Sequence, residues 1–274
     1  MEREPSVRSD GHDVTPLLPP HVTTRRAEPL LACLESQAEL QQNVVVLPMT
    51  GRRYIIHIPT DASRDRMFEE AQKDPDKTMP FWSRMWPSGI GLADAVLRRA
   101  DQVAGKRVLE LGCGLGTTAT AAVEAGARLV VADYSTLPIT FCRYNALYNT
   151  GRSPSSIQFN WRHPSAHAMA RAESGGGFPL ILAADLLYES RDIEPLLSIV
   201  ERLLAPNGML WLAEPGRRTA QRFLNTAAEL GWQGVSEEFH GPWPDASETT
   251  VHIHFLRRPT YADQLATTLG GWRP

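Results

Sequence analysis

The stretch that decides the fold is Val108–Ala119, "VLELGCGLGTTA", in a chain of 274 residues. A short apolar run leads into three alternating glycines, Gly112, Gly114 and Gly116, and a segment of small residues follows them. A loop of this kind cradles a phosphate, holds a nucleoside that carries an amino acid, or simply makes a tight turn. We therefore expect a strand, then a loop that a ligand can approach closely, then a helix with free N–H groups at its start.

Short apolar runs and amphipathic helical segments alternate on both sides of this stretch. Strands are expected at 108–111, 129–132, 157–159, 178–185, 209–214, 235–239 and 249–258. Segments with helical periodicity separate most of these strands, but none is expected between 157–159 and 178–185 or between the last two strands. This pattern predicts an α/β, Rossmann-like fold, with a seven-stranded mostly parallel sheet, helices on both faces and an antiparallel last strand. Ser88 is expected to cap the helix that precedes the sheet.

Composition and the positions of proline and glycine residues divide the chain into four parts. Residues 1–28 are polar and contain prolines, which predicts a disordered leader. Residues 29–79 predict an N-terminal extension of a helix and a short hairpin, whose turn lies at Thr50–Gly51. Residues 80–258 carry the predicted sheet, and residues 259–274 form a C-terminal tail.

Charge and cysteine content exclude several classes of protein. The net charge of -3 argues against a nucleic-acid partner. Three scattered cysteines suit neither a disulfide framework nor a zinc knuckle, which favours a reducing, cytoplasmic setting. The first residues, "MEREPSVRSDGHD", carry charges of both signs and no apolar core, so we do not expect a secretory signal there. We also expect no membrane span, because no apolar run is long enough. His252 and His254 share one strand face but lack a third ligand nearby, so no metal site is expected.

The glycine spacing discriminates between two cofactors. The dinucleotide fingerprint G-x-G-x-x-G fits Gly112 and Gly114, but Thr117 stands where its third glycine belongs. Asp133 ends the next strand, where an acid binds ribose hydroxyls in NAD enzymes and S-adenosylmethionine enzymes alike. Glu110 ahead of the glycines favours S-adenosylmethionine. An NAD-dependent oxidoreductase remains the alternative from another enzyme class.

Several motifs together resemble class I, seven-stranded S-adenosylmethionine-dependent methyltransferases. They are "VLELGCGLG", "VVADYS" and "LILAADLLYE". More narrowly, "FWSRMWPSGIGLADAV", "FNW", "DLLY" and "EPGR" resemble methyltransferase family 16. That family includes protein-lysine methyltransferases and the electron-transfer-flavoprotein β-subunit lysine methyltransferase branch. The resemblance runs from about Pro80 to Arg257. Asn160 departs from it, because family members commonly carry an acid before the tryptophan of "FNW".

The resemblance implies a set of site residues. The cofactor-binding residues would be Trp86, Glu110, Gly112, Cys113, Gly114, Asp133, Trp161 and Ala184, with S-adenosyl-L-methionine as cofactor. Asp185 and Tyr188 would be catalytic. Phe81 and Trp82 line an acceptor pocket or are simply buried, and both readings stay open.

These residues suit methyl transfer to an amine. The amine must arrive neutral with its lone pair directed at the methyl group, so positioning dominates the barrier. Oxygens of Asp185 and Tyr188 can hold the remaining N–H groups. We therefore expect N-methylation of a lysine in a protein partner. The alternatives are a small-molecule N- or O-methyltransferase and a cofactor-binding module without catalysis. Arg217 either meets an acidic substrate patch or is surface charge, and Asn145 is expected to be a polar residue near a helix end.

Overall fold

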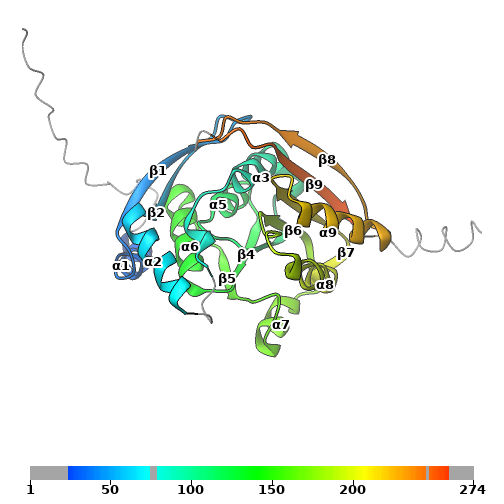
Figure 1. Ribbon diagram of the computed structural model, residues 1–274, viewed down its shortest axis with the longest axis horizontal. Helices are drawn as coiled ribbons and strands as arrows, with labels where there is room; N and C mark the ends of the chain where they lie inside the picture. The colour runs from blue at the N-terminus through cyan, green and yellow to red at the C-terminus, as the bar shows by residue number, and fades with distance from the viewer. Residues whose placement is uncertain (1–23, 75–78, 245–246, 259–274) are drawn as a thin grey trace, which may run out of the picture.

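A seven-stranded sheet forms the centre of the computed structural model, which describes residues 24–74, 79–244 and 247–258 (Figure 1). Its strands are β3 (Arg107–Leu111), β4 (Arg128–Asp133), β5 (Ser155–Gln158), β6 (Phe178–Ala184), β7 (Leu204–Glu214), β8 (Gln233–Phe239) and β9 (Val251–Arg257). The strand order is β5-β4-β3-β6-β7-β9-β8, and β9 runs antiparallel to both of its neighbours. The predicted fold class is confirmed, including the antiparallel last strand.

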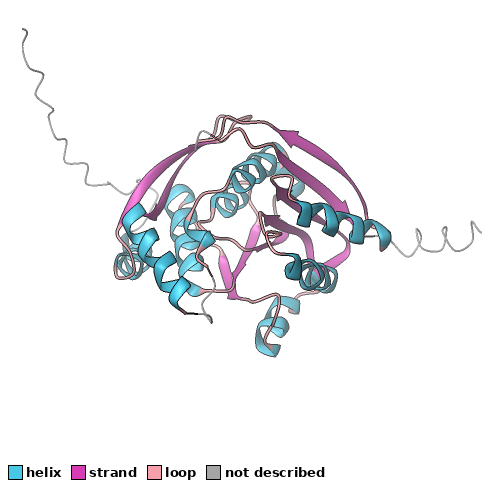
Figure 2. Ribbon diagram, viewed as in Figure 1, coloured by secondary structure: helices cyan, strands magenta, loops and turns pink. Residues whose placement is uncertain are grey.

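Helices cover both faces of the sheet (Figure 2). They are α3 (Pro87–Arg98), α4 (Ala100–Val103), α5 (Thr117–Glu124), α6 (Thr136–Thr150), α7 (Ala166–Glu173), α8 (Ile193–Leu203) and α9 (Arg218–Glu229), with short 3₁₀ turns η1 (Phe81–Ser83) and η2 (Ser190–Asp192). Successive residues of a strand point to opposite faces, so Val108 packs with α3, α5 and α6, whereas Leu109 packs with α7, α8 and α9. This two-sided burial explains why the central strands β3, β4 and β6 are mainly apolar, whereas the edge strand β5 ("SSIQ") is not.

The order of the strands places a ligand site beside β3. From β3 the chain runs outward through β4 to β5, then returns to β6 on the other side of β3. At such a reversal the loops after neighbouring strands diverge and leave a crevice at the carboxyl ends of the strands. The glycine loop after β3 therefore lies at the expected position for a ligand.

The N-terminal extension packs against α6. It consists of α1 (Thr24–Glu35), the hairpin β1 (Leu40–Val46) and β2 (Arg53–Pro59), and α2 (Asp61–Lys73). Helix α1 begins at Thr24, ahead of the expected boundary at Pro29, which the helix accommodates in its interior. The rest of the predicted leader, 1–23, and the predicted tail, 259–274, lie outside the described residues. Within the described part of the chain, no helix is long and apolar enough to cross a bilayer.

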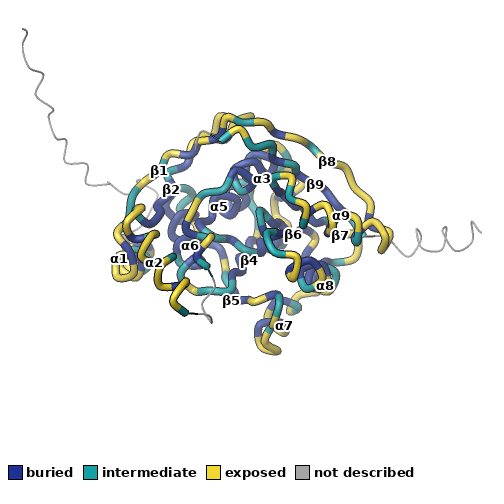
Figure 3. Tube along the Cα trace, viewed as in Figure 1, coloured by how far each residue is buried: buried dark blue, intermediate teal, exposed yellow. Residues whose placement is uncertain are grey.

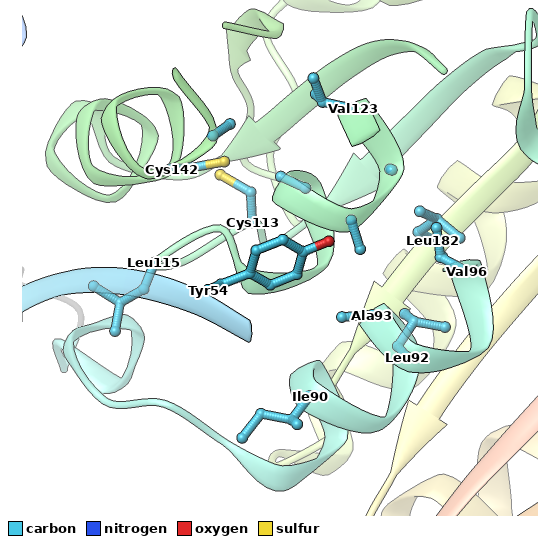
Figure 4. Close-up of a cluster of buried hydrophobic side chains, with 14 of the residues drawn as sticks. Tyr54, Ile90, Leu92, Ala93, Val96, Cys113, Leu115, Val123, Cys142 and Leu182 are labelled. Carbon is cyan, nitrogen blue, oxygen red and sulfur yellow. The ribbon is translucent and has the colours of Figure 1, made fainter. Parts of the chain in front are cut away.

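Asn145 fixes the extension to the sheet domain and is not the helix-end polar residue that we expected. It is fully buried within α6, and its Oδ1 accepts the His57 N–H at 2.8 Å. Its Nδ2 donates to the carbonyls of His57 (3.0 Å) and Leu115 (2.8 Å). One side chain thus joins the hairpin to the glycine loop. Tyr54 of β2 lies in the same buried cluster as Cys113 and Cys142 (Figure 4). Figure 3 shows that α5, β4 and β6 at the centre are mainly buried, whereas β8 at the edge of the sheet is mainly exposed.

The expected cap of α3 is also different. Trp86 is the N-cap and Pro87 is the first helical residue, so Ser88 lies inside the first turn and is buried. Proline is well suited to this first position because its φ is preset and its missing N–H would have no helical partner there. The helix therefore begins at Pro87, one residue before the serine that we expected to cap it.

Candidate active site

Every residue predicted to belong to the site lines one cavity at the carboxyl ends of the central strands. These residues are Trp86, Glu110, Gly112, Cys113, Gly114, Asp133, Trp161, Ala184, Asp185 and Tyr188. Phe81 and Trp82 line the same cavity, so both face the site rather than only the core. Tyr134 lines the cavity as well, because it directly follows Asp133. No role was predicted for it from the sequence.

The glycine loop needs glycine at two positions for packing reasons. Gly112 has φ +64°, and a Cβ there would lie 2.2 Å from Cδ2 of Leu186. Gly116 has φ +84°, and a Cβ there would lie 2.6 Å from Cα of Cys142. The loop is therefore pressed against the chain after β6 on one side and against α6 on the other.

Two buried carboxylates flank this loop, and neither has a cationic partner in the described residues. Asp133 accepts the N–H of Gly114 at 3.1 Å and that of Tyr134 at 2.9 Å. Burial raises the pKa of Asp133 to about 6, although these backbone N–H groups act to lower it. Burial, and next to it the charge of Asp133, raises the pKa of Glu110 well above its usual range. Oε2 of Glu110 is buried without a hydrogen-bond partner.

This donor-poor arrangement fits S-adenosylmethionine. Carboxylates are acceptors when ionised, so Glu110 and Asp133 call for a ligand rich in donors and positive charge. S-adenosylmethionine presents an ammonium group and two ribose hydroxyls, which are all donors. The unpartnered Oε2 of Glu110 is the kind of atom that such a ligand would satisfy.

Two tryptophans of the cavity have their polar edges engaged elsewhere. Nε1 of Trp86 donates to the carbonyl of Phe81 at 2.9 Å, and Nε1 of Trp161 donates to Oδ1 of Asp192 at 3.2 Å. Because an indole has a single N–H, these rings offer a ligand only apolar contact. Asn160 does not line the cavity; its Oδ1 accepts the N–H of Arg162 at 3.0 Å.

Asp185 occupies a turn directly after β6. Its φ is +53°, a left-handed conformation that aspartate tolerates better than most residues. Its N–H donates to the carbonyl of Ala213, and its Oδ1 accepts from Nε of Arg217 at 3.0 Å. Burial raises the pKa of Asp185, while the Arg217 guanidinium acts to lower it. The carboxylate is thus held away from the helix that follows and toward the cavity.

Arg217, whose role the sequence left open, is not among the residues that line the cavity, but it pairs with Asp185, which is one of them. The loop that carries it is fixed by Glu214, whose Oε2 accepts the N–H groups of Gly216 (2.6 Å) and Arg217 (2.8 Å). Oε1 of Glu214 lies 3.3 Å from Nε2 of His254, and Nδ1 of His254 lies 2.7 Å from Oγ of Ser236. Burial acts to raise the pKa of Glu214, but His254 and the loop N–H groups outweigh it and the pKa is lowered. The motif "EPGR" marks this loop, but nothing in it predicts that Arg217 pairs with Asp185.

The two histidines of β9 therefore take part in the protein's own contacts. Their rings stack at 6.2 Å with an interplanar angle of 9°, as expected for alternate residues on one face. Among the residues that the structure describes, no group of three or more histidine, cysteine, aspartate or glutamate side chains could hold a metal ion.

Tyr188 closes the cavity on the side of η1. Its ring meets that of Phe81 edge-on, with centroids 5.3 Å apart. Burial raises the pKa of Tyr188 to about 12, so the phenol stays neutral at physiological pH. A neutral phenol keeps lone pairs that accept hydrogen bonds and a proton that it donates. Asp185, Tyr188 and Phe81 thus bring polar and apolar groups together in the lining of the cavity.

Comparison with known proteins identifies similar chains. A family described as "Methyltransferase domain" matches residues 90–268. The human histone-arginine methyltransferase METTL23 is 28% identical over 131 residues, which cover 46% of this chain and 67% of the relative. The electron transfer flavoprotein beta subunit lysine methyltransferase of Danio rerio is 30% identical over 140 residues, which cover 50% of this chain and 51% of the relative. The chain thus spans about half to two thirds of these relatives.

Solved structures with similar folds are also found. A putative RNA methyltransferase from Pyrococcus horikoshii gives a TM-score of 0.48 at 13% identity, covering 73% of this chain and 98% of that one. The N-methyltransferase NodS from Bradyrhizobium japonicum, in complex with S-adenosylhomocysteine, gives a TM-score of 0.45 at 17% identity. That match covers 70% of this chain and 98% of NodS.

Proposed function

The chain belongs to the methyltransferase domain family and uses S-adenosylmethionine, and on that premise we propose that it methylates the side-chain amine of a lysine in a protein. The observation that carries the proposal is the meeting of Asp185, Tyr188 and the glycine loop around one cavity. The oxygens that can accept hydrogen bonds from an amine and those that can accept them from the cofactor therefore line the same cavity.

The cofactor half of the site is proposed to use Glu110 and Asp133 with the loop from Gly112 to Gly114. Asp133 suits the ribose hydroxyls, and Glu110 suits the positively charged end of the amino acid part. Ala184 and the rings of Trp86 and Trp161 supply apolar walls. When bound, S-adenosylmethionine supplies a methyl group attached to a positively charged sulfur. A neutral amine can attack the carbon of this methyl group, and S-adenosylhomocysteine is the leaving group.

The acceptor half is proposed to use Asp185 and Tyr188. An amine on a long alkyl chain enters between Phe81 and Tyr188, whose rings suit its methylene groups. The carboxylate of Asp185 and the oxygen of Tyr188 accept its N–H groups and so orient the lone pair. Asp185 then holds or passes to water the proton that the nitrogen loses.

Arg217 is proposed to be the group that the amine displaces. It holds the Asp185 carboxylate at 3.0 Å, yet its side chain is 38% exposed and so can swing toward solvent. A cationic lysine head competes for the same oxygen. Once there, it can pass one proton through this carboxylate, whose pKa burial has raised, to water. The amine is then neutral, and the carboxylate is ionised again and can accept its N–H.

A protein acceptor is supported by the relatives named as lysine and histone-arginine methyltransferases. An O-methyltransferase of ubiquinone biosynthesis from Xanthomonas oryzae is similar at 31% identity over 127 residues, which cover half of that relative. A polar pair of oxygens beside a neutral, apolar entrance suits an amine better than a phenol, because a phenol needs a base but no second acceptor.

The test is labelled methyl transfer into a cell lysate. The full chain is incubated with lysate and S-adenosylmethionine that carries a radioactive methyl group, and the products are separated into protein and small-molecule fractions. We expect label in protein that yields methyllysine after acid hydrolysis, and none with Asp185→Asn. Label confined to small molecules, or recovered as methylarginine, would refute the lysine assignment.

A further inference from the structure

A second hollow lies beside the active-site cavity, between the N-terminal extension and the start of α3. Its volume is about 400 Å³. Asn43 and Val44 of β1, Asp61 and Arg64 of α2, and Arg84 are among the residues that line it. We name this hollow the extension groove. The extension thus carries, besides its contacts with α6, a surface of its own that no step of the proposed methyl transfer uses.

The extension groove adjoins the active-site cavity, because Arg84, Met85 and Trp86 line both hollows. A chain lying in the groove would therefore pass next to the cavity that Asp185 lines. Figure 1 places β1, β2 and α2 together on one side of the sheet domain.

The groove carries two guanidinium groups against one carboxylate. Arg64 pairs with Asp61 at 2.7 Å, and the Arg64 side chain is 15% exposed whereas that of Asp61 is 76% exposed. Nε of Arg64 is buried and has no hydrogen-bond partner in the structure. Arg84 lies 5.7 Å from the centre of the Phe68 ring and pairs with no carboxylate in the described ranges. Arg64 is thus a largely buried guanidinium with one N–H unpartnered, and Arg84 is an exposed guanidinium. Both groups suit carboxylates of a ligand.

Strand β1 offers a place for an extended chain. In the described residues it pairs with β2 alone, which leaves its second edge without a strand. Val44 is 50% exposed and Val46 is 44% exposed. An unpaired edge with exposed β-branched side chains is a surface on which an extended peptide adds as a strand.

We propose that the extension groove binds an extended, acidic segment of the acceptor protein next to the lysine that is methylated. Arg64 and Arg84 receive its carboxylates, and β1 supports its backbone. The proposal rests on the proposed protein-lysine function. It assigns to the N-terminal extension the choice of acceptor, while Asp185 and Tyr188 act on the amine.

The first test measures binding of matched synthetic peptides. Each peptide has one lysine and a fluorescent label, with glutamate flanks in one and glutamine flanks in the other. Fluorescence anisotropy with the full chain and S-adenosylhomocysteine gives the two affinities. We expect the glutamate peptide to bind on the order of tenfold tighter, by an amount that shrinks as salt rises. Equal affinities would overturn the proposal.

The second test uses the ion pair between Arg64 and Asp61. Arg64→Gln should weaken glutamate-peptide binding on the order of tenfold, because a donor is lost. Asp61→Asn should strengthen it, because the competing carboxylate is removed. If the pair were merely structural, both changes would break it and shift binding in the same direction, which would overturn the proposal. Arg171→Gln, an exposed arginine on α7, is the matched control and should leave binding unchanged.

The third test identifies what lies in the groove. A photo-crosslinking amino acid replaces Val44 in the full chain, and the glutamate peptide is added. Capture of the peptide supports the proposal, whereas capture of residues 1–23 or of a second copy of the chain overturns it. Methyllysine formation in the lysate is scored separately: if it persists while the peptide preference is absent, the groove proposal fails and the function stands. If methyllysine is absent, the function itself fails.

Discussion

Two pairs of buried acids lie at the same edge of the sheet, and they differ in what faces them. Asp133, at the end of β4, receives hydrogen bonds from the backbone N–H groups of Gly114 and Tyr134, and Oε2 of Glu110 in β3 is buried and receives none. Asp185 and Glu214, at the ends of β6 and β7, face side chains that are or can become cationic, Arg217 and His254.

The difference separates two kinds of site. An acid that is buried without compensation has a raised pKa and gains free energy when a ligand brings donors to it. An acid that the protein already compensates must exchange its partner before it can act on a ligand. The first pair is therefore suited to hold a cofactor, and the second pair is suited to admit an acceptor in competition with Arg217.

The largest effect is expected at Asp185. Asp185→Asn keeps the shape and removes the charge and the proton acceptor, so turnover should fall by about 10²- to 10⁴-fold. The affinity for S-adenosylhomocysteine should change little, because the first pair is untouched. Methyl transfer and calorimetry measure the two effects. Tyr188→Phe should lose less, since one acceptor remains; full activity in both variants would remove these residues as the acceptor pair.

The next largest effect is expected on stability, at Gly116 in the glycine loop between Glu110 and Asp133. Gly116→Ala places a Cβ 2.6 Å from Cα of Cys142 at φ +84°, so the free energy of unfolding should fall by about 2–4 kcal/mol. Urea unfolding followed by circular dichroism measures this. Gly51→Ala is the matched control, because its φ is +66° but nothing lies within 4 Å of the added Cβ. If both variants lose the same free energy of unfolding, the close contact between Gly116 and α6 does not contribute to the loss.

The elements of the central sheet could be predicted because their signals are local. An apolar run that ends in glycines, and a second run that ends in Asp133, each describe a strand and its loop within about ten residues. Chain order then brings these loops to one edge, which is why the predicted site residues meet around one cavity. Helix α7 was not predicted, because "AHAMARAE" is short and has no long apolar face.

Contacts between distant segments could not be predicted. Asn145 joins α6 to His57, which lies 88 residues earlier, and the sequence around Asn145 carries no trace of that contact. Arg217 meets Asp185 across 32 residues, and only the docking of the loop after β7 beside the turn after β6 creates the pair. Both depend on which segments pack together, a property of the whole fold rather than of any local pattern.

A smaller effect is expected in how cofactor binding depends on pH. Because burial raises the pKa of Asp133 to about 6, wild-type affinity for S-adenosylhomocysteine should be full above that pH. It should weaken as the pH falls further, by at most about tenfold per pH unit, since donors favour the ionised carboxylate. Asp133→Asn should bind about 10- to 100-fold more weakly at pH 8 and lose the part of this dependence that Asp133 causes, while the part that Glu110 causes remains. Calorimetry from pH 5 to pH 8 measures both, and a flat wild-type profile would contradict the ribose-binding role.

The smallest effect, and the one that bears most directly on the comparison, is expected at Arg217. Its guanidinium opposes the rise that burial causes in the pKa of Asp185. Arg217→Gln removes this opposition, so the Asp185 pKa should rise and the acidic limb of kcat/KM should move to higher pH. Near pH 8 the rate should change only a few-fold, because loss of charge compensation and loss of a competitor for the amine act in opposite directions. Arg217→Lys keeps a cation beside the carboxylate and should leave the limb close to its wild-type position. An acidic limb that stays in place in Arg217→Gln, or that moves to lower pH, would mean that Arg217 does not set the charge state of Asp185. The second pair of acids would then work as the first does, with partners that a ligand supplies.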